Sequence, residues 1–115
     1  SDKWDVEAIF SSIEEAYKAL EKVKEREGAD KTWPELYEYK GGLSSQAVLK
    51  KVLDSYYEIE RELVKIYTYA HLRFDENITN QKVKELFETI QLVIHQFQTA
   101  ASWVVPEILH LEQPL

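Results

Sequence analysis

The segment "SQAVLKKVLDSYYEIERELVKIYTYAHLRF", residues 45–74, has the pattern of one long amphipathic helix. Apolar side chains recur in it every three or four residues, which places them on one face of an α-helix. These side chains are Leu49, Val52, Leu53, Tyr56, Ile59, Leu63, Ile66, Tyr67, Ala70 and Phe74. Ser44 or Ser45 can cap its start, so we predict a helix over residues 45–74 as the backbone of the domain.

A second long amphipathic segment follows after a turn. The sequence "DENITN", residues 75–80, has the composition of a connection, and Asn77 or Thr79 can cap the helix that follows it. The apolar stripe of this helix consists of Val83, Leu86, Phe87, Ile90, Ile94, Phe97, Ala101 and Val104. Pro106 cannot continue a helix, and we expect the helix to stop there.

A helix of medium length is predicted upstream, over residues 12–27. Ser12 and Glu15 have the spacing of a capping box, and Gly28 tolerates the left-handed backbone that commonly ends a helix. The stripe of this helix consists of Ile13, Ala16, Tyr17, Leu20 and Val23. The preceding "WDVEAIF", residues 4–10, predicts a short lead-in helical turn capped by Asp5.

A short helix is predicted between the medium helix and the long one. In "TWPELYEYK", residues 32–40, Thr32 can cap the helix and Pro34 falls in its first turn, while Gly41 and Gly42 follow it. We therefore predict a helix over residues 33–40. Short connections make neighbouring helices antiparallel, so the expected fold is an all-α, up-and-down helical bundle with two long helices, one medium and one short. A chain of 115 residues is expected to form a single domain over residues 1–115.

The composition disfavours several classes of function. The chain has 21 acidic residues against 14 Lys and Arg, a net charge of −7, and no clustered basic patch, so nucleic-acid binding is not expected. It has no cysteine, which excludes disulfides and thiol chemistry and is compatible with the cytoplasm. No apolar run approaches the roughly 18 residues of a membrane span, and we see no signal peptide.

The three histidines give little support for a catalytic or metal site. None is followed by Glu, so the H-E-x-x-H zinc motif is absent. We expect His71 to border the core, without a neighbouring acid to orient it, and His95 to be solvated. Residues 107–110, "EILH", have the Glu-x-x-His spacing of di-iron bundles, but one copy in a tail is insufficient for such a site.

Other chemistry is equally weak in the sequence. Ser44 and Ser45 are better explained by capping than by nucleophilic catalysis, and the pair of glycines at 41 and 42 is too short to cradle a phosphate. A dicarboxylate site between helices would need convergent cations, and the chain has only three arginines. We therefore assign no catalytic, cofactor-binding or metal-binding residue to this chain.

Some apolar side chains do not fit the main stripes. Tyr69 and Leu72 are predicted to lie opposite the stripe of their helix, among charged side chains. Leu92 and Trp103 are predicted to lie opposite the stripe of the following helix. Each alone can be an ordinary exposed apolar residue, but together they suggest a surface for a second packing partner. These four residues are our interface candidates.

The order of several short motifs resembles one known family across nearly the whole chain. The matching motifs are Trp4-Asp5-Val6 with Ile9-Phe10, Gly41-Gly42-Leu43 with Ser45, Tyr67 with Tyr69-Ala70 and Leu72, Asp75-Glu76-Asn77, Ser102-Trp103, and Pro106-Glu107-Ile108-Leu109. In this order they resemble the N-terminal helical region of the oligoendopeptidase F family of thimet-like zinc metallopeptidases.

The resemblance implies a non-catalytic lobe of a cytoplasmic zinc oligoendopeptidase. The zinc, its ligands and the general-base glutamate would then belong to a larger catalytic lobe that this chain lacks. This helical lobe would form one wall of the peptide-binding cleft and admit only short peptides. Its partners would be the catalytic lobe of the same protein and, in the complete enzyme, short peptide substrates.

Two other interpretations remain open. The chain can be a stand-alone helical module for protein interaction or self-association, with its exposed aromatic residues binding a partner or a second copy. It can also be a small-molecule enzyme, although no cluster of cations or ligands in the sequence supports that function.

Overall fold

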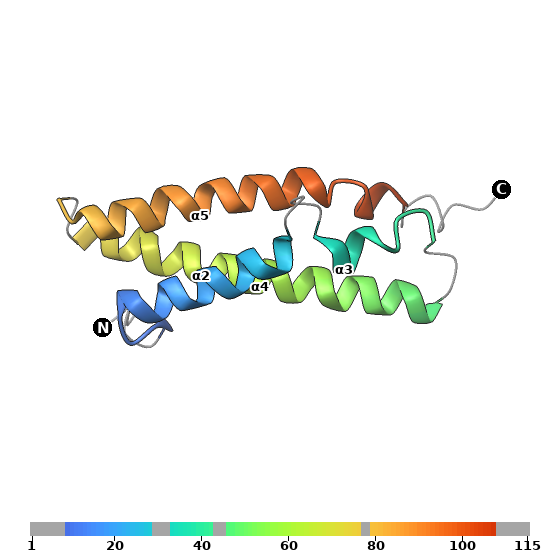
Figure 1. Ribbon diagram of the computed structural model, residues 1–115, viewed down its shortest axis with the longest axis horizontal. Helices are drawn as coiled ribbons and strands as arrows, with labels where there is room; N and C mark the ends of the chain where they lie inside the picture. The colour runs from blue at the N-terminus through green and yellow to red at the C-terminus, as the bar shows by residue number, and fades with distance from the viewer. Residues whose placement is uncertain (1–8, 29–32, 43–45, 77–78, 108–115) are drawn as a thin grey trace.

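The computed structural model describes residues 9–28, 33–42, 46–76 and 79–107, and the regular elements within these ranges are helices (Figure 1). They are α2 (Ile13–Glu27), α3 (Pro34–Tyr37), α4 (Gln46–Glu76) and α5 (Gln81–Ala100). The predicted all-α fold is therefore confirmed. No helix in the described part of the chain combines the length and apolarity needed to cross a membrane.

The three longer helices run up and down, as predicted. In Figure 1, α4 runs back along α2, and α5 returns beside α4 for most of its length. The short α3 packs beside the N-terminal half of α4. The short connections between successive helices produce this antiparallel order.

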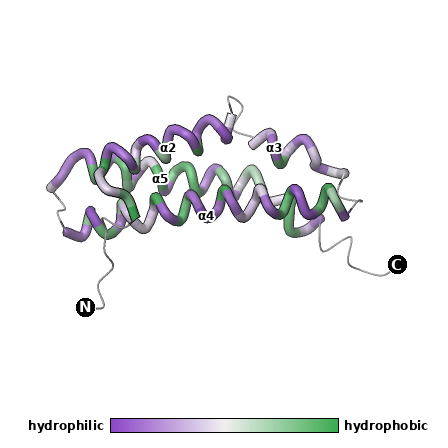
Figure 2. The backbone as a smooth tube through the Cα atoms, turned by 90° about the horizontal axis from the view of Figure 1, so that it is seen from below, coloured by the Kyte–Doolittle hydropathy of each residue, from purple (hydrophilic) through white to green (hydrophobic). Residues whose placement is uncertain are grey.

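The helices form two layers. Figure 2 shows α2 and α3 together on one side of the pair formed by α4 and α5. The molecule measures 55 × 35 × 18 Å. Since the axes of packed helices lie about 8 to 10 Å apart, the shortest dimension leaves room for two layers of helices. One face of the α4–α5 pair is covered by α2 and α3, and the opposite face is not covered by any described helix.

The core lies between these layers and is formed mainly by the predicted stripes. Its buried side chains include Leu20, Val23, Val52, Ile59, Leu63, Ile66, Ala70, Leu86, Ile90 and Phe97. Trp33 and Leu36 of the short-helix region are also fully buried against it. Tyr67 and Phe74, which the periodicity placed in the core, are only half-buried. They lie at the edge of the stripe, on the side where no further helix of the described ranges covers α4.

The ends of α2 agree with the sequence-based prediction. Ser12 is the N-cap, and its Oγ accepts a hydrogen bond from the backbone N–H of Glu15 at 3.3 Å. Gly28 follows the helix with a φ of +79°, a backbone conformation that residues other than glycine rarely adopt. A Cβ built on Gly28 would lie 3.2 Å from the ring of Pro34, so the next segment also approaches closely here. The lead-in turn predicted over residues 4–10 lies almost entirely outside the described residues.

Two helix starts differ from the prediction. The N-cap of α5 is Asn80, whose Oδ1 accepts from the Val83 N–H at 3.1 Å, so Asn77 and Thr79 were the wrong choices. The short helix covers only Pro34–Tyr37, and its N-cap is Trp33 with a left-handed φ of +56°. Thr32, like Ser44 and Ser45 before α4, lies outside the described residues.

The end of α5 also differs from the prediction. The helix ends at Ala100, well before Pro106, and residues 101–103 form a turn. Proline lacks an N–H and its ring clashes with the carbonyl four residues back, so a helix continuing to Pro106 would be disrupted at Ser102. A new helical turn begins at Val104 and accommodates Pro106 near its start.

Candidate functional site

Tyr69, one of the four predicted interface residues, lies inside the molecule. Its side chain is fully buried, so the predicted exposure on a charged face is wrong. The ring packs edge-on against Phe10, with centroids 5.3 Å apart, and its hydroxyl accepts a hydrogen bond from Nε of Arg73 at 3.2 Å. The reason is tertiary: α2 and the residues just before it cover this side of α4. Helical periodicity alone could not show that cover.

The other three interface candidates do not form one surface. Leu72 and Trp103 are half-buried and pack against the core of this chain. The indole Nε1 of Trp103 is buried and has no hydrogen-bond partner among the described residues. Leu92 is 55% exposed on the outer side of α5. A role for these residues in an interface stays a prediction, and Leu92 is the only one of the four that projects well into solvent.

The structure brings together a different apolar surface, on the side of α4 and α5 that faces away from α2. We call it the open face, and it consists of Tyr57, Val64, Tyr67 and His71 of α4 with Phe87 and Ile94 of α5. Val64 is 52% exposed and Tyr57 is 56% exposed. The rings of Tyr67, His71 and Phe87 lie 5.7 to 5.8 Å from one another, centroid to centroid.

A shallow groove of about 310 Å³ runs between α4 and α5 within the open face. Val64 and Ile94 line it, with Tyr56, Glu60 and Gln98. The sequence analysis assigned Tyr67, Phe87 and Ile94 to the buried stripes and did not single out Tyr57 or Val64, so it did not predict this surface. The signal was present: residues 57, 64 and 71 are spaced seven apart, and residues with this spacing lie on the same face of a helix, two turns from one another.

His71 has an acidic neighbour on the open face. Its Nδ1 lies 3.4 Å from Oδ2 of Asp75, one helical turn further along α4. The expectation that no acid lies at a neighbouring helical position was therefore wrong. The imidazole also stacks on Tyr67, with an angle of 30° between the ring planes. Both side chains of the His71–Asp75 pair are substantially exposed, which fits a surface contact better than a catalytic pair.

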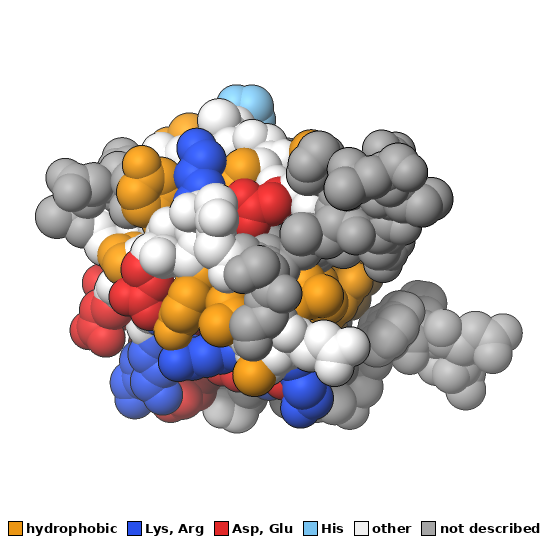
Figure 3. Space-filling model, turned by 90° about the vertical axis from the view of Figure 1, so that its right-hand side faces the viewer, with side chains coloured by type: hydrophobic (Ala, Val, Ile, Leu, Met, Phe, Trp, Pro, Cys, Tyr) orange, Lys and Arg blue, Asp and Glu red, His pale blue; other side chains and the backbone are white. Residues whose placement is uncertain are grey.

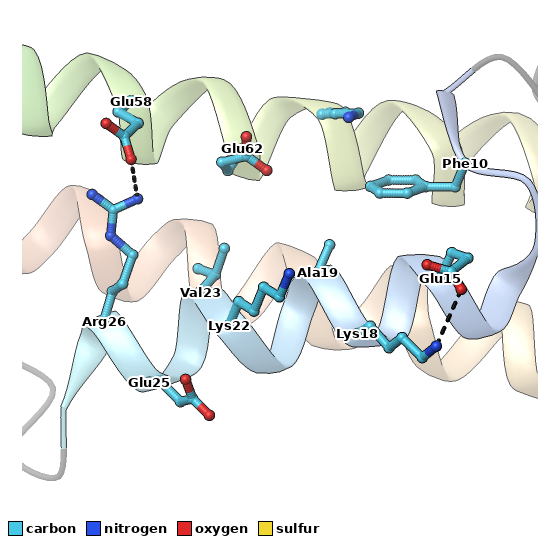
Figure 4. Close-up of a pocket in the computed structure, with 11 residues that line it drawn as sticks. Phe10, Glu15, Lys18, Ala19, Lys22, Val23, Glu25, Arg26, Glu58 and Glu62 are labelled. Atoms are coloured by element: carbon cyan, nitrogen blue, oxygen red, sulfur yellow. Dashed lines mark hydrogen bonds and ion pairs between the residues drawn. The ribbon is translucent and has the colours of Figure 1, made fainter.

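A second groove, of about 610 Å³, lies between α2 and α4 on the other side of the molecule (Figure 4). Four acids and four bases line it, so its formal charges cancel. They are Glu15, Glu25, Glu58 and Glu62 with Lys18, Lys22, Arg26 and Lys65. At one end, Nζ of Lys65 lies 5.0 Å from the centre of the Phe10 ring, within the range of a cation–π contact. The groove offers hydrogen-bonding groups of both signs over an apolar floor.

Arg26 closes the other end of this groove. Figure 4 shows its guanidinium reaching across to α4, where Nη1 donates to Oε1 of Glu58 at 2.9 Å. The same guanidinium donates through Nε and Nη2 to the carboxylate of Glu35, in the first turn of α3. Burial lowers the pKa of Arg26, but the hydrogen bonds and charges of Glu35 and Glu58 outweigh this effect and raise it. Arg26 thus connects α2, α3 and α4.

The end of the molecule near α3 combines apolar and charged side chains (Figure 3). The ammonium groups of Lys40 and Lys51 lie 5.6 and 5.2 Å from the centres of the Tyr37 and Tyr39 rings. The backbone N–H of Gly41 donates to Oε1 of Glu107 at 2.7 Å, which ties the turn after α3 to the segment after α5. These contacts explain packing at this end and form no recognisable ligand site.

No group of three His, Asp or Glu side chains that could hold a metal occurs among the described residues. His110 and the end of the "EILH" motif lie outside them. What the described part of the chain presents is therefore a pair of surfaces, one charged and one apolar, on a helical scaffold.

Comparison with known proteins finds two related oligopeptidases. The chain is 34% identical over 113 residues to oligopeptidase PepF of Bacillus subtilis, a match that covers 97% of this chain and 16% of that protein. It is 26% identical over 113 residues to an oligoendopeptidase F homolog of Borreliella burgdorferi, covering 98% of this chain and 18% of the relative. The chain is thus a homologue of the oligoendopeptidase F proteins, which confirms the resemblance predicted from its motifs.

The homology covers nearly all of this chain but a minor part of each relative. The chain spans less than a fifth of the length of these two proteins. No family model matches the chain, and no solved structure matches it.

Proposed function

We propose that this chain is the non-catalytic N-terminal lobe of a zinc-dependent oligoendopeptidase. The observation that carries the proposal is the match of 97% of the chain to 16% of an oligopeptidase. On this proposal most of the enzyme, including the zinc and its ligands, lies in the rest of the polypeptide. No chemical step is assigned to the described residues, since they include no group that could hold a metal.

In this proposal the lobe forms one wall of the peptide-binding cleft and restricts it to short peptides. A wall of packed helices excludes folded substrates and positions a short peptide by restricting its motion, which contributes to catalysis without any bond chemistry. The charged groove between α2 and α4 supports this role, because its acids and bases can pair with both ends of a short peptide. The proposed setting is the cytoplasm.

The test uses the full-length product of the gene. We expect it to hydrolyse short fluorogenic peptides, to lose this activity on zinc chelation, and to spare a long unfolded protein. The 115-residue chain with added zinc is expected to be inactive. A full-length product that cleaves long unfolded chains as readily as short peptides would contradict the size restriction, and one without zinc-dependent peptidase activity would contradict the function.

A second candidate function is a stand-alone helical module for protein interaction or self-association. The open face favours it, because solvent-exposed apolar surfaces commonly mark interaction sites. The mass of the natural product in its source cells separates the two candidates. A product several times heavier than 13.5 kDa supports the peptidase lobe, whereas a product of 13.5 kDa supports the stand-alone module.

A further inference from the structure

The two faces of the α4–α5 pair differ in how they are covered. On one face α2 packs over α4, so that even Tyr69 is fully buried. On the other face no described helix lies over the open face, and Tyr57 and Val64 each expose more than half of their surface. Figure 2 shows this one-sided arrangement, with α2 and α3 in a single layer. The α4–α5 pair is thus built with apolar side chains on both sides, but the described part of the chain provides a helical cover on only one.

The chemistry of the open face contrasts with the rest of the surface. The protein has a net charge of −7 and 30% charged residues, yet the six side chains of the open face are aliphatic, aromatic or imidazole. Glu60 and Gln98 line the groove between them, and Asp75 lies beside His71 at the end of α4. Burying such a surface lowers the free energy because apolar area is removed from water. The same surface offers few hydrogen-bonding groups to the backbone of a bound peptide.

We propose that the open face is buried against the remainder of the same polypeptide. This inference rests on the proposed function, because it requires a chain that continues beyond these residues. Its support is the length of the relatives: the matched region is only 16 to 18% of them, so most of a polypeptide of that size is left to supply a cover. A third layer over α4 and α5 would bury the open face as α2 buries Tyr69.

Two other occupants fit less well. A second copy of this chain would bring one net charge of −7 against another, which opposes association. A peptide substrate would need hydrogen-bonding side chains along its backbone, and the groove between α2 and α4 is richer in these than the open face.

Cysteine labelling in the full-length protein tests the proposal, since this chain has no cysteine of its own. The variant is Val64→Cys on the open face, and the matched control is Leu92→Cys on the outer side of α5. The two native side chains are aliphatic and similarly exposed in the structure, at 52% and 55%. Each protein is treated with a maleimide reagent at low protein concentration, and the labelled peptide is quantified by mass spectrometry.

If the open face is covered, the cysteine at 64 reacts only when the interface opens, so its labelling is expected to be slower than that at 92 by a factor of about ten or more. Rapid labelling at 64, at the rate found at 92 or faster, would overturn the proposal. Protection at 64 that disappears on dilution would also overturn it, because it would identify a second copy as the cover. Tyr57→Cys provides a second position on the open face and is expected to behave like Val64→Cys.

The same preparations separate this inference from the proposed function. Zinc-dependent cleavage of short peptides together with equal labelling would retain the function and reject the docking surface. Concentration-independent protection at 64 without peptidase activity would retain the docking surface and reject the function. A natural product of only 13.5 kDa would reject both.

Discussion

The indole of Trp33 packs edge-on against the ring of Phe97, with centroids 5.0 Å apart and an angle of 76° between the planes. This contact joins the segment after α2 to the C-terminal half of α5, and Trp33 is fully buried. Its backbone is held at a φ of +56°, a conformation that costs a residue other than glycine roughly 1 kcal/mol or more. Burial of a large aromatic side chain offsets that cost, so Trp33 fixes both the position of α3 and the direction of the chain.

We predict that Trp33→Ala lowers the free energy of unfolding of the 115-residue chain by about 3 to 5 kcal/mol, the usual cost of truncating a buried aromatic side chain. Urea unfolding followed by circular dichroism measures the change. Tyr37→Ala is the control, since Tyr37 lies in the adjacent α3 and is 49% exposed. We expect it to cost well under 1 kcal/mol. Equal losses for the two variants would show that Trp33 is not an anchor.

Arg26 provides a second link between elements, through Glu58 of α4 and Glu35 of α3. We predict that Arg26→Gln lowers the free energy of unfolding by about 1 kcal/mol, because the guanidinium is partly buried and two carboxylates lose their partner. Glu58 is more exposed than Glu35, so Glu58→Gln is expected to cost less than Glu35→Gln. Salt screens exposed charges, and unfolding in 1 M NaCl is expected to reduce the Glu58 effect first. The reverse order of the two glutamate variants would contradict this assignment.

The hydroxyl of Tyr17 donates a hydrogen bond to the backbone carbonyl of Lys82 at 2.8 Å and connects α2 to the start of α5. Burial raises the pKa of Tyr17, and the negative charge of Glu85 raises it further. Burial, together with Glu60 and Tyr57, also raises the pKa of Tyr56. Each folded-state pKa thus exceeds the unfolded value of about 10. The stability that these groups contribute is complete below about pH 10 and is lost as the pH rises through the folded-state pKa.

We therefore predict that the free energy of unfolding falls as the pH is raised above about 10, and that Tyr17→Phe makes this fall less steep. At pH 7 the same variant is expected to cost about 0.5 to 1 kcal/mol, the usual value for one lost hydrogen bond near the surface. Tyr37→Phe is the control at pH 7, because the hydroxyl of the exposed Tyr37 makes no hydrogen bond to another described residue. A pH profile that is identical in the native chain and in Tyr17→Phe would refute the role of this hydroxyl.

Much of the fold could be predicted from periodicity and capping, because both act over one or two helical turns. The stripes of α2, α4 and α5 are buried largely as expected. Ser12 caps the start of α2 and Gly28 its end, as predicted from the two residue types. The homology to the oligoendopeptidase F proteins could also be predicted, from the order of short motifs along the chain. These features depend on residues that are close in sequence or on a pattern of sequence itself.

What could not be predicted depends on contacts between distant segments. The periodicity of α4 alone predicted that Tyr69 is exposed, but its ring packs against Phe10, a residue about sixty positions earlier in the sequence. Trp33 carried no signal of burial, since its partner Phe97 is equally distant in sequence. The open face was missed for the opposite reason: Tyr57 and Val64 lie just beside the stripe, and the absence of a covering helix among the described residues is a tertiary feature.

The clearest test of these corrections compares Tyr69 with Leu92, two residues first assigned to the same kind of surface. Tyr69 is fully buried, whereas Leu92 is mostly exposed, so Tyr69→Ala is predicted to lower the free energy of unfolding by about 3 to 5 kcal/mol and Leu92→Ala by less than about 0.5 kcal/mol. Tyr69→Phe keeps the ring against Phe10 and removes only the oxygen that accepts from Arg73, so it is expected to cost about 1 kcal/mol. Urea unfolding of the three variants measures these differences. A small effect of Tyr69→Ala would contradict the burial of Tyr69. A large effect of Leu92→Ala would show that the outer side of α5 is covered.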